Sequence, residues 1–363
     1  MIKPSLLLLC CVLTGCAVRP DTRTIWPVGA SAPQGETKQI FVATTRETAQ
    51  VPADGFTSLR SPVPHFAEFA ISIPPGHVPG EIEWPRGETN PRTDFAVASH
   101  MRLDKETFLR RINAANAEGT GVFVHGYNYN FPEALFRSAQ MAADAQISGA
   151  PILFSWPSSA SLLGYASDRE SVTYSRDALA ELLTRLGEAS DGNPVTVFGH
   201  SMGGWLVMEA LRQMRIAGED EALSHLEVLL AAPDIDVDVF RQQLAVIETM
   251  EIPMVVMVSP DDRALELSAL AGQHKRVGAL DITDPIIQSA ARDSNVVLID
   301  ISAVDARSRL NHDRYIQLAS VYPALVSEMQ KGSTFTEAGA FVLNSAGQII
   351  SAPLRVVDTA LGQ

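Results

Sequence analysis

Cysteine is scarce in this chain of 363 residues, and its three copies all fall within the first sixteen positions. The rest of the chain can therefore form neither a disulfide between its own cysteines nor a metal site rich in thiolates. Basic side chains are also in deficit, because 28 Lys and Arg face 42 Asp and Glu and leave a net charge of −14. A surface of that sign repels phosphate backbones, so no nucleic-acid partner is expected.

Long hydrophobic runs are missing as well. The apolar run near the start covers only Leu6 to Leu13, whereas a helix that crosses a bilayer needs about 20 residues. This short run, which follows Lys3 after one Pro-Ser pair, is typical of a signal peptide. It ends in Leu13-Thr14-Gly15-Cys16, which resembles the signal of bacterial lipoproteins. The alternative is an ordinary secretory peptide with a chance cysteine.

The lipoprotein resemblance implies removal of residues 1–15 and attachment of lipid to Cys16. The protein is then expected to be exported and anchored in the bacterial envelope by its N-terminal lipid. Ala17, rather than Asp, at the second mature position favours the outer membrane if the host is Gram-negative. Residues 16–38 contain several prolines and glycines and are interpreted as a lipidated tether, which would span roughly 25 Å as a flexible coil.

Residues 39–330 are predicted to form one α/β domain, and residues 331–363 an extension of unknown role with strand-like segments at 340–343 and 354–357. Short, continuously apolar segments are typical of strands that are covered on both faces, as in parallel sheets. Six such segments occur, and their starts are far enough apart for a crossover helix each time: Val122–Val124, Ile152–Phe154, Val195–Phe198, Val228–Ala232, Met254–Val258 and Val296–Ile301. Helices are expected at Glu133–Ile147, Tyr174–Leu186 and Asn311–Met329. Earlier strands, at Ile40–Thr44, Phe69–Ile73 and Phe95–Ser99, are expected to form an antiparallel edge.

A candidate nucleophile lies in Gly199-His200-Ser201-Met202-Gly203, between a predicted strand and the helical segment Gly204–Arg215. A sharp strand-to-helix turn strains the backbone of its central serine and lifts the hydroxyl above the sheet. Gly199 and Gly203 suit such an elbow because the neighbouring chain leaves no room for side chains. The alternative is a glycine-rich turn whose serine only caps the helix.

The same turn directs the backbone N–H of Met202 toward a developing oxyanion. A second donor is expected from the loop after the first central strand, His125-Gly126-Tyr127-Asn128, and the N–H of Tyr127 is the candidate. His125 is interpreted as a structural residue that holds this loop. His200 is interpreted as the variable position of the elbow.

A serine hydroxyl needs an imidazole base, and an acid to orient that base. His312 follows the last predicted strand and is the candidate base, with His274 as the fallback. The acid is expected after the preceding strand, where Asp262 is favoured over Asp261 and the other of the two is expected to cap the next helix. A less favoured set of acids follows the strand before that: Asp234, Asp236 and Asp238.

Together these residues resemble the α/β-hydrolase superfamily, in which the order along the chain is Ser, Asp, His. More narrowly, the chain resembles a bacterial branch of poorly characterised hydrolases, many of them lipoproteins. The motifs that carry this likeness are Ala43-Thr44-Thr45-Arg46, Val124-His125-Gly126-Tyr127-Asn128, Ser155-Trp156-Pro157-Ser158, Gly199 to Gly204 and Asp262-Arg263-Ala264-Leu265. The resemblance implies serine-hydrolase chemistry on carboxylic esters, without a cofactor or a metal.

The hypothesis is therefore a small-molecule ester hydrolase with Tyr129, Phe131 and Trp156 as candidate pocket residues. The same triad could instead serve an amidase, a thioesterase or an acyltransferase on envelope molecules. From a different class, the chain could be a non-catalytic lipoprotein that binds ligands on a hydrolase scaffold. The lack of a long apolar insertion favours short or soluble esters.

Overall fold

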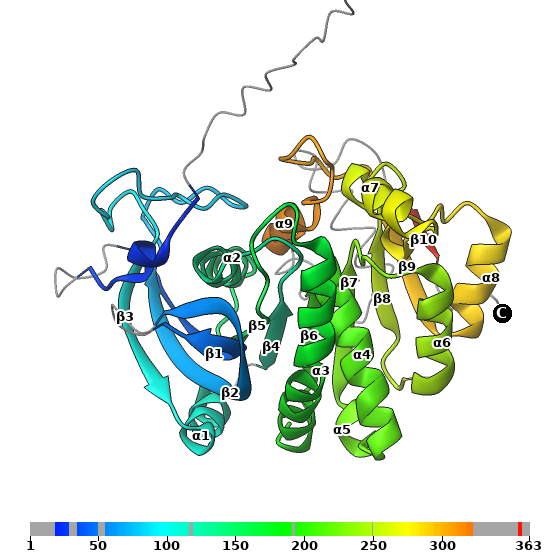
Figure 1. The fold of residues 1–363 in the computed structure, drawn as a ribbon, viewed down its shortest axis with the longest axis horizontal. Helices are drawn as coiled ribbons and strands as arrows, with labels where there is room; N and C mark the ends of the chain where they lie inside the picture. The colour runs from blue at the N-terminus through cyan, green and yellow to red at the C-terminus, as the bar shows by residue number, and fades with distance from the viewer. Residues whose placement is uncertain are drawn as a thin grey trace, which may run out of the picture.

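The computed structural model describes residues 19–28, 35–49, 55–115, 119–190, 193–248, 250–321 and 355–357. Within these ranges the strands form one sheet of ten, in the order β10-β9-β8-β7-β6-β4-β5-β1-β2-β3. Helices cover both faces of the sheet, which gives the molecule three layers (Figure 1). The predicted fold class is confirmed: the sheet is mostly parallel, of α/β-hydrolase type, with antiparallel strands at its N-terminal edge.

The six predicted central strands are all present, and no bound differs from its prediction by more than two residues. They are β4 (Thr120–Val124), β5 (Ala150–Ser155), β6 (Val195–His200), β7 (Leu226–Ala231), β8 (Met254–Val258) and β9 (Val296–Asp300). Neighbouring members of this set pair in parallel. Their carboxyl ends therefore meet at one edge of the sheet, where open α/β folds place their ligands.

The N-terminal edge is built from three longer strands. β1 (Thr37–Thr48) pairs in parallel with β5 and antiparallel with β2 (Phe56–Ser72), which in turn pairs antiparallel with β3 (Ala96–Leu103). At the opposite edge β10 (Arg355–Val357) lies antiparallel to β9 and coincides with the strand-like segment predicted at 354–357. The segment predicted at 340–343 lies outside the described residues.

Alternate residues of the strands point to opposite faces of the sheet, so the core is divided in two. On one face the apolar side chains pack against α1 (Lys105–Ala115), α3 (Tyr165–Glu188), α4 (Met202–Ala217), α5 (Asp220–Ser224), α6 (Val237–Ile247) and α8 (Pro285–Asp293). The other face packs against α2 (Phe131–Asp144) and α9 (Tyr315–Leu318). In Figure 1, α9 and α7 (Arg263–Gly272) lie at the upper end of the sheet and α5 at the lower end.

Helix α2 illustrates how the local sequence sets an element boundary. Its N-cap residue Asn130 accepts from the backbone N–H of Glu133, while the Glu133 carboxylate accepts from the backbone N–H of Asn130. This capping box satisfies two amides that no helical carbonyl can reach, and Pro132 fits the first turn because it lacks an N–H. The helix starts two residues before the predicted segment and ends three residues before its predicted end.

The predicted helix over Asn311–Met329 is wrong for its first part. Residues 311–314 form a loop, and among the described residues up to 321 only α9 and a 3₁₀ turn at Ala319–Val321 follow. Asn311 has φ 59°, a left-handed backbone that cannot continue a helix. Helix α3 is longer than predicted, because it begins nine residues before the predicted start at Tyr174.

The predicted tether also differs from the structure. Residues 19–28 pack on the domain through a 3₁₀ turn at Thr22–Ile25 (η1), in which Ile25 is fully buried. The backbone N–H of Val28 donates to the carbonyl of Val97, 3.0 Å away. Cys16 and the signal segment lie outside the described residues.

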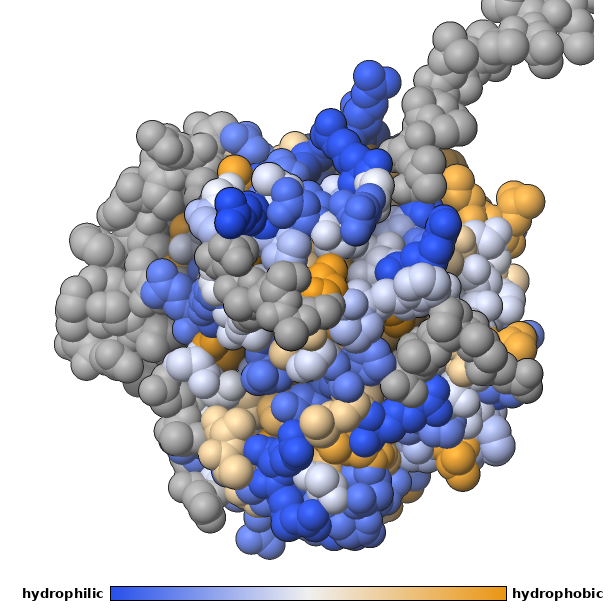
Figure 2. All heavy atoms as spheres, turned by 90° about the vertical axis from the view of Figure 1, so that its left-hand side faces the viewer, coloured by the Kyte–Doolittle hydropathy of each residue, from blue (hydrophilic) through white to orange (hydrophobic). Residues whose placement is uncertain are grey.

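The face formed by the antiparallel edge is mostly hydrophilic, with scattered hydrophobic side chains (Figure 2). Among the described residues, every helix is too short or too polar to cross a bilayer.

Close packing of α4 on β4 explains one glycine of the predicted elbow. A Cβ atom added to Gly203 would lie 2.3 Å from the carbonyl oxygen of Val124 and 2.4 Å from that of His125. Both neighbours are backbone atoms at the end of β4, so a side chain would force the helix and the strand apart.

We therefore expect Gly203→Ala to lower the free energy of unfolding by about 3 kcal/mol or more. Gly121, in the same strand β4, is the matched control, because a Cβ added there meets nothing within 4 Å. Gly121→Ala should change the free energy of unfolding by less than about 1 kcal/mol. Urea denaturation of the two variants measures the difference, and equal stabilities would contradict this packing.

Candidate active site

Ser201 occupies a strained turn between β6 and α4. Its backbone has φ 54° and ψ −122°, a combination that side chains other than glycine rarely adopt, and it is the N-cap residue of α4. Its N–H donates to Ala231 O over 2.9 Å, and its carbonyl accepts from Asp234 N over 3.1 Å. Both bonds reach the end of β7 and the loop after it, so the neighbouring strand holds the turn in place.

The loop after β4 lies directly against this turn. A Cβ added to Gly126 would be 3.0 Å from Cβ of Ser201 and 2.7 Å from Nδ1 of His200. The two predicted oxyanion donors are thus on adjoining segments, with Met202 at the first turn of α4 and Tyr127 next to Gly126. Among the described residues, neither of these two backbone N–H groups donates to a protein acceptor. They remain available for a ligand oxygen.

His125 holds the loop after β4 from inside. Its Nδ1–H donates to Gly126 O over 2.9 Å, its Nε2 accepts from Ser155 Oγ over 3.2 Å, and its ring stacks on Trp156 at 4.9 Å. Trp156 in turn donates from Nε1 to the carbonyl of His125, over 2.7 Å. Burial, together with the nearby Arg46 cation, lowers the pKa of His125 to about 3, so its imidazole stays neutral. The structural interpretation of this histidine agrees with these contacts.

Arg46 is a buried cation that the sequence marked only as part of a motif. Its Nε donates to Ser155 Oγ over 2.9 Å, and its two terminal nitrogens donate to the carbonyls of Tyr129, Ser158 and Thr57, over 3.0, 3.3 and 3.2 Å. Burial lowers the pKa of Arg46 to about 9. The guanidinium therefore joins β1 to the loops after β4 and β5, and the first of these loops lies against the turn of Ser201.

His312 and Asp262, 50 positions apart, meet at the carboxyl edge of the sheet. The Nδ1–H of His312 donates to Oδ2 of the fully buried Asp262, over 2.6 Å. The other carboxylate oxygen of Asp262 accepts from the backbone N–H groups of Ala264 and Leu265, each at 3.0 Å, and so caps α7. One carboxylate thus orients the imidazole and caps the helix, where a separate residue was expected for each task.

Asp261 has a different partner. Its carboxylate accepts two parallel bonds from Arg314, at 2.6 and 2.8 Å, and one from the Asn311 side chain at 3.0 Å. Asn311 and Arg314 flank His312, so this cluster ties the histidine loop to the β8–α7 turn. The structure therefore places Asp262, and not Asp261, at the imidazole. The prediction that the second aspartate caps the helix is wrong, because the cap is Asp262 itself.

His200 was interpreted as the variable position of the elbow, and its contacts correct that interpretation. Its Nε2–H donates to the carbonyl of His312 over 3.2 Å, and its ring lies 4.8 Å from the His312 ring and 4.2 Å from that of Tyr315. Burial lowers its pKa well below the usual value, so the ring is neutral. The residue before Ser201 therefore binds the loop that carries His312.

Ser201 and His312 themselves form no direct hydrogen bond among the described residues. They are connected through His200, which precedes Ser201 and contacts His312. In unliganded enzymes the bond between nucleophile and base is often long and tightens only when substrate binds.

Asp234 follows β7, where its backbone N–H donates to the carbonyl of Ser201, and its carboxylate is surrounded by donors. It accepts from Ser268 Oγ at 2.6 Å and Tyr165 Oη at 2.8 Å, and its carboxylate is 3.3 Å from the buried Arg276. Asp236, two positions on, accepts from the first amides of α6 and caps that helix. These acids therefore hold the loop after β7 in place, and neither contacts His312 among the described residues.

Two of the three candidate pocket residues are core residues instead. Trp156 and Phe131 are fully buried, the first against His125 and the second against Phe56 and Phe69. The fallback base His274 is exposed at the end of α7, with Asp236 4.0 Å away. Among the described residues, no group of three or more His, Asp or Glu side chains is arranged to hold a metal ion.

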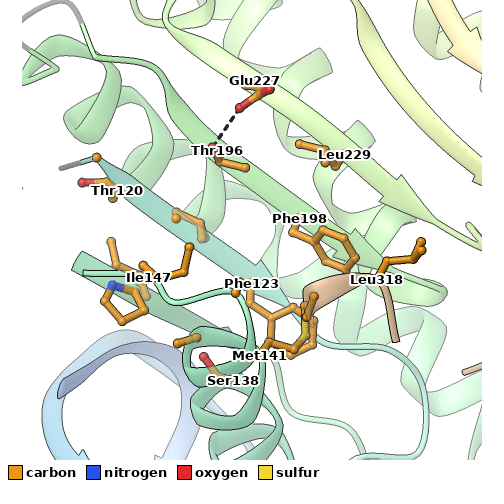
Figure 3. Close-up of a pocket in the computed structure, with 18 of the residues that line it drawn as sticks. Thr120, Phe123, Ser138, Met141, Ile147, Thr196, Phe198, Glu227, Leu229 and Leu318 are labelled. Carbon is orange, nitrogen blue, oxygen red and sulfur yellow. Dashed lines mark hydrogen bonds between the residues drawn. The ribbon is translucent and has the colours of Figure 1, made fainter. Parts of the chain in front are cut away.

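A cavity of about 360 Å³ lies on the opposite side of the sheet from α3 and α4 and does not include Ser201 or His312 (Figure 3). Its lining is mostly apolar, with Phe123, Met141, Phe198, Leu229 and Leu318 among its residues. One carboxyl, that of Glu227, accepts from Thr196 Oγ1 over 2.9 Å, and burial raises the pKa of this carboxyl. The cavity also reaches Gly119 and Asn193, which precede strands, so it extends toward the amino ends of the sheet.

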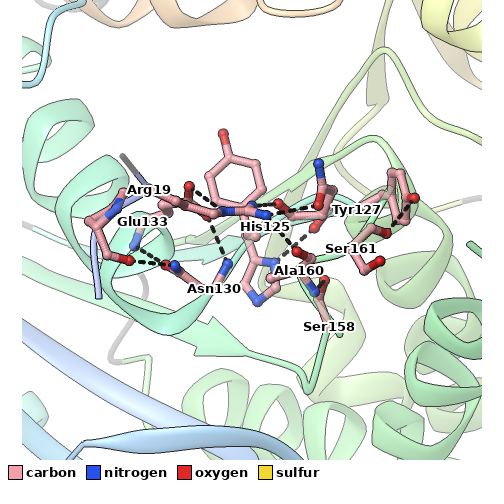
Figure 4. A network of polar contacts seen from close by, with 12 residues as sticks. Arg19, His125, Tyr127, Asn130, Glu133, Ser158, Ala160 and Ser161 are labelled. Carbon is pink, nitrogen blue, oxygen red and sulfur yellow. Dashed lines mark hydrogen bonds and ion pairs between the residues drawn. The ribbon is translucent and has the colours of Figure 1, made fainter. Parts of the chain in front are cut away.

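The docked N-terminal segment reaches the rim of the site (Figure 4). Arg19 binds the Glu133 carboxylate through two nitrogens, at 2.7 and 2.6 Å, and donates to Ala160 O at 2.6 Å. It also donates to the side-chain oxygen of Asn128 at 3.1 Å and to the Asn128 carbonyl. The Arg19 side chain thus joins the loop after β4, the start of α2 and the loop after β5.

The ionisation of His312 tests this geometry. Burial alone would lower its pKa, but the hydrogen bond and charge of Asp262, with Asp234 and Asp313 nearby, raise it above the usual 6.5. A folded-state pKa above the unfolded value adds stability below pH 6.5 that is lost as the pH rises through the folded-state pKa.

Asp262→Asn should lower the pKa of His312, whereas Asp261→Asn should leave it nearly unchanged. Histidine titration by NMR measures both, and a larger fall in Asp261→Asn would contradict the pairing.

A family model matches most of this chain and agrees with its architecture. Residues 102–329, more than half of the chain, match the family described as alpha/beta hydrolase of unknown function (DUF900). The uncharacterized protein alr1448 of Nostoc sp. (strain PCC 7120) is 39% identical over 61 residues, which are 17% of this chain and 16% of that protein. The crystal structure of a candidate hydrolase from Agrobacterium vitis S4 is similar over 68% of this chain and 97% of its own, with 12% identity and a TM-score of 0.30.

The family match covers β4 through α9, and so includes the elbow, the loop after β4 and the histidine loop. The chain belongs to the family of alpha/beta hydrolases of unknown function (DUF900).

Proposed function

We propose that the protein is a serine hydrolase that cleaves carboxylic esters through an acyl-enzyme, with Ser201, His312 and Asp262 as the triad. The observation that carries the proposal is the 2.6 Å hydrogen bond between Asp262 and Nδ1 of His312, on a loop that contacts the residue before a strained serine. The bond fixes the tautomer in which Nε2 has a free lone pair. That lone pair is what a serine hydroxyl requires of its base.

In the first half-reaction, Nε2 of His312 takes the Ser201 proton as Oγ attacks the ester carbonyl. The negative charge moves to the carbonyl oxygen, where the N–H groups of Met202 and Tyr127 are the proposed donors. Each such donor is worth about 3 kcal/mol in the transition state. The imidazolium then protonates the leaving alcohol, and the acyl group stays on Ser201.

In the second half-reaction, His312 removes a proton from water, which attacks the acyl carbonyl. Ser201 leaves with the proton from the imidazolium, and the carboxylic acid is released. The Asp262 carboxylate accepts three hydrogen bonds, and the one from Nδ1 keeps the imidazole oriented through both half-reactions. The steps use only side chains and backbone groups of this chain.

Replacement of the nucleophile is the direct test. Ser201→Ala should reduce turnover of a soluble short-chain ester by about 10⁴-fold or more, with the fold unchanged. Ser289→Ala, at an exposed position of α8, is the matched control and should retain full activity. Turnover is followed spectrophotometrically and the fold by circular dichroism. Equal rates for wild type and Ser201→Ala, or no turnover of any ester by folded wild-type protein, would count against the proposal and favour a non-catalytic binding role.

The pH dependence tests the base and its partner together. Because Asp262 and its neighbours raise the pKa of His312 above 6.5 despite burial, kcat/KM should fall as the pH drops through that raised value. In Asp262→Asn the acid limb should move to lower pH, and kcat should fall by about 10³–10⁴-fold. An acid limb that stays at the wild-type pH in Asp262→Asn would remove His312 as the base.

A further inference from the structure

Two adjacent leucines protrude beside the proposed site. Leu162 and Leu163, in the loop between β5 and α3, are 80% and 96% exposed. The residues before them are fixed, because Ala160 O accepts from Arg19 and Ser161 O accepts from the Tyr127 hydroxyl over 2.8 Å (Figure 4). The loop therefore presents two apolar side chains to solvent from an anchored base, next to a proposed oxyanion donor.

A second apolar pair lies on α7, at the same edge of the sheet. Leu267 and Leu270 are 60% and 73% exposed and, three positions apart, share one side of the helix. The Tyr165 hydroxyl, at the start of α3, is 2.8 Å from Ser268 Oγ on α7 and so joins the two segments. Leu162, Leu163, Leu267 and Leu270 are together called the rim leucines below.

Only a short stretch of chain separates Cys16 from the edge that carries the rim leucines. Arg19 is bound at the rim, and only residues 17 and 18 separate it from Cys16. Three peptide units span at most about 11 Å, so a lipid on Cys16 would hold the rim within that reach of the membrane. The tether expected from composition would have allowed roughly 25 Å.

We propose that the rim leucines are a membrane-contact surface and that the substrate is an acyl ester presented by a bilayer. The inference deepens the proposed function and rests on it for the chemistry, and on lipid attachment at Cys16 for the anchor. Four exposed leucines would lose contact with water in the interfacial region of a bilayer. The ester carbonyl of a lipid at that depth would lie next to Ser201, while its acyl chain stays in the membrane.

The proposed lipid on Cys16 favours a bilayer over other apolar partners for the rim leucines. A second copy of the chain or an apolar peptide could also cover leucines, but neither would be brought to this edge by a lipid three residues from Arg19. The net charge of −14 makes two copies of the chain repel each other. The rim leucines lie on a short loop and a helix, and not on a long insertion. The sequence favoured short or soluble esters only because it lacks a long apolar insertion.

Membrane contact can be measured without catalysis. Full chains that carry Leu163→Cys or Ile216→Cys are labelled with a nitrobenzoxadiazole fluorophore and reconstituted into vesicles of phosphatidylethanolamine and phosphatidylglycerol with brominated acyl chains. Ile216 is the matched control, because it is 55% exposed at the end of α4, toward the lower end of the sheet (Figure 1). We expect quenching of about twofold or more at position 163 and little at position 216. Equal quenching at both positions, or labelling of wild-type protein at a free Cys16, would overturn the inference.

A second experiment compares two substrates in the same proteins. The double variant Leu162→Ser and Leu163→Ser should hydrolyse an acyl ester in vesicles about tenfold more slowly than wild type, and a soluble ester within about twofold of it. Ile216→Ser should change neither rate. Equal losses on both substrates, or none on the vesicle ester, would overturn the membrane role. If neither ester is cleaved by any folded protein, the proposed function fails, while the quenching result still decides the membrane contact.

Discussion

The hydrogen bond between Asp262 and His312 is the contact on which the account of this protein depends. It joins two loops that are 50 positions apart in the chain, and both lie at the carboxyl edge of a parallel sheet. Because Asp262 also caps α7, its orientation is set by the helix as well as by the imidazole. A carboxylate held in this way gives the histidine one defined direction.

The rest of the site is a set of loops that polar side chains, most of them buried, hold together. Arg46 joins β1 to the loops after β4 and β5, and Asp261 with Arg314 holds the loop of His312. His200 connects the elbow to that same loop from the position before Ser201. None of these groups has a proposed part in bond breaking. They act by fixing positions, which is the requirement for donors and a base to meet a single carbonyl.

Much of the fold could be predicted, because continuous apolar segments with room for a helix between them indicate a parallel sheet. The elbow was predictable for a similar reason: Gly199 and Gly203 flank Ser201 where the backbone is crowded. Apart from the pair of Asp262 and His312, the long-range partners of polar residues were not predictable. The bond from Arg314 to Asp261 and the bond from His200 to the carbonyl of His312 depend on how loops distant in sequence approach each other. The prolines and glycines of residues 16–38 also suggested a free tether, whereas Arg19 is bound to Glu133 and Ala160. Composition cannot predict such a contact, because it depends on acceptors far away in the sequence.

The central claim is that Ser201, His312 and two backbone amides converge on one reacting group. A crystal structure of the protein after reaction with a fluorophosphonate tests this most directly. The account predicts phosphorus bonded to Oγ of Ser201, a phosphoryl oxygen about 3 Å from the N–H groups of Met202 and Tyr127, and Nε2 of His312 within hydrogen-bond reach of the bridging or leaving oxygen. An adduct on another residue, or one on Ser201 whose oxygen points away from both amides while His312 remains distant, would contradict it.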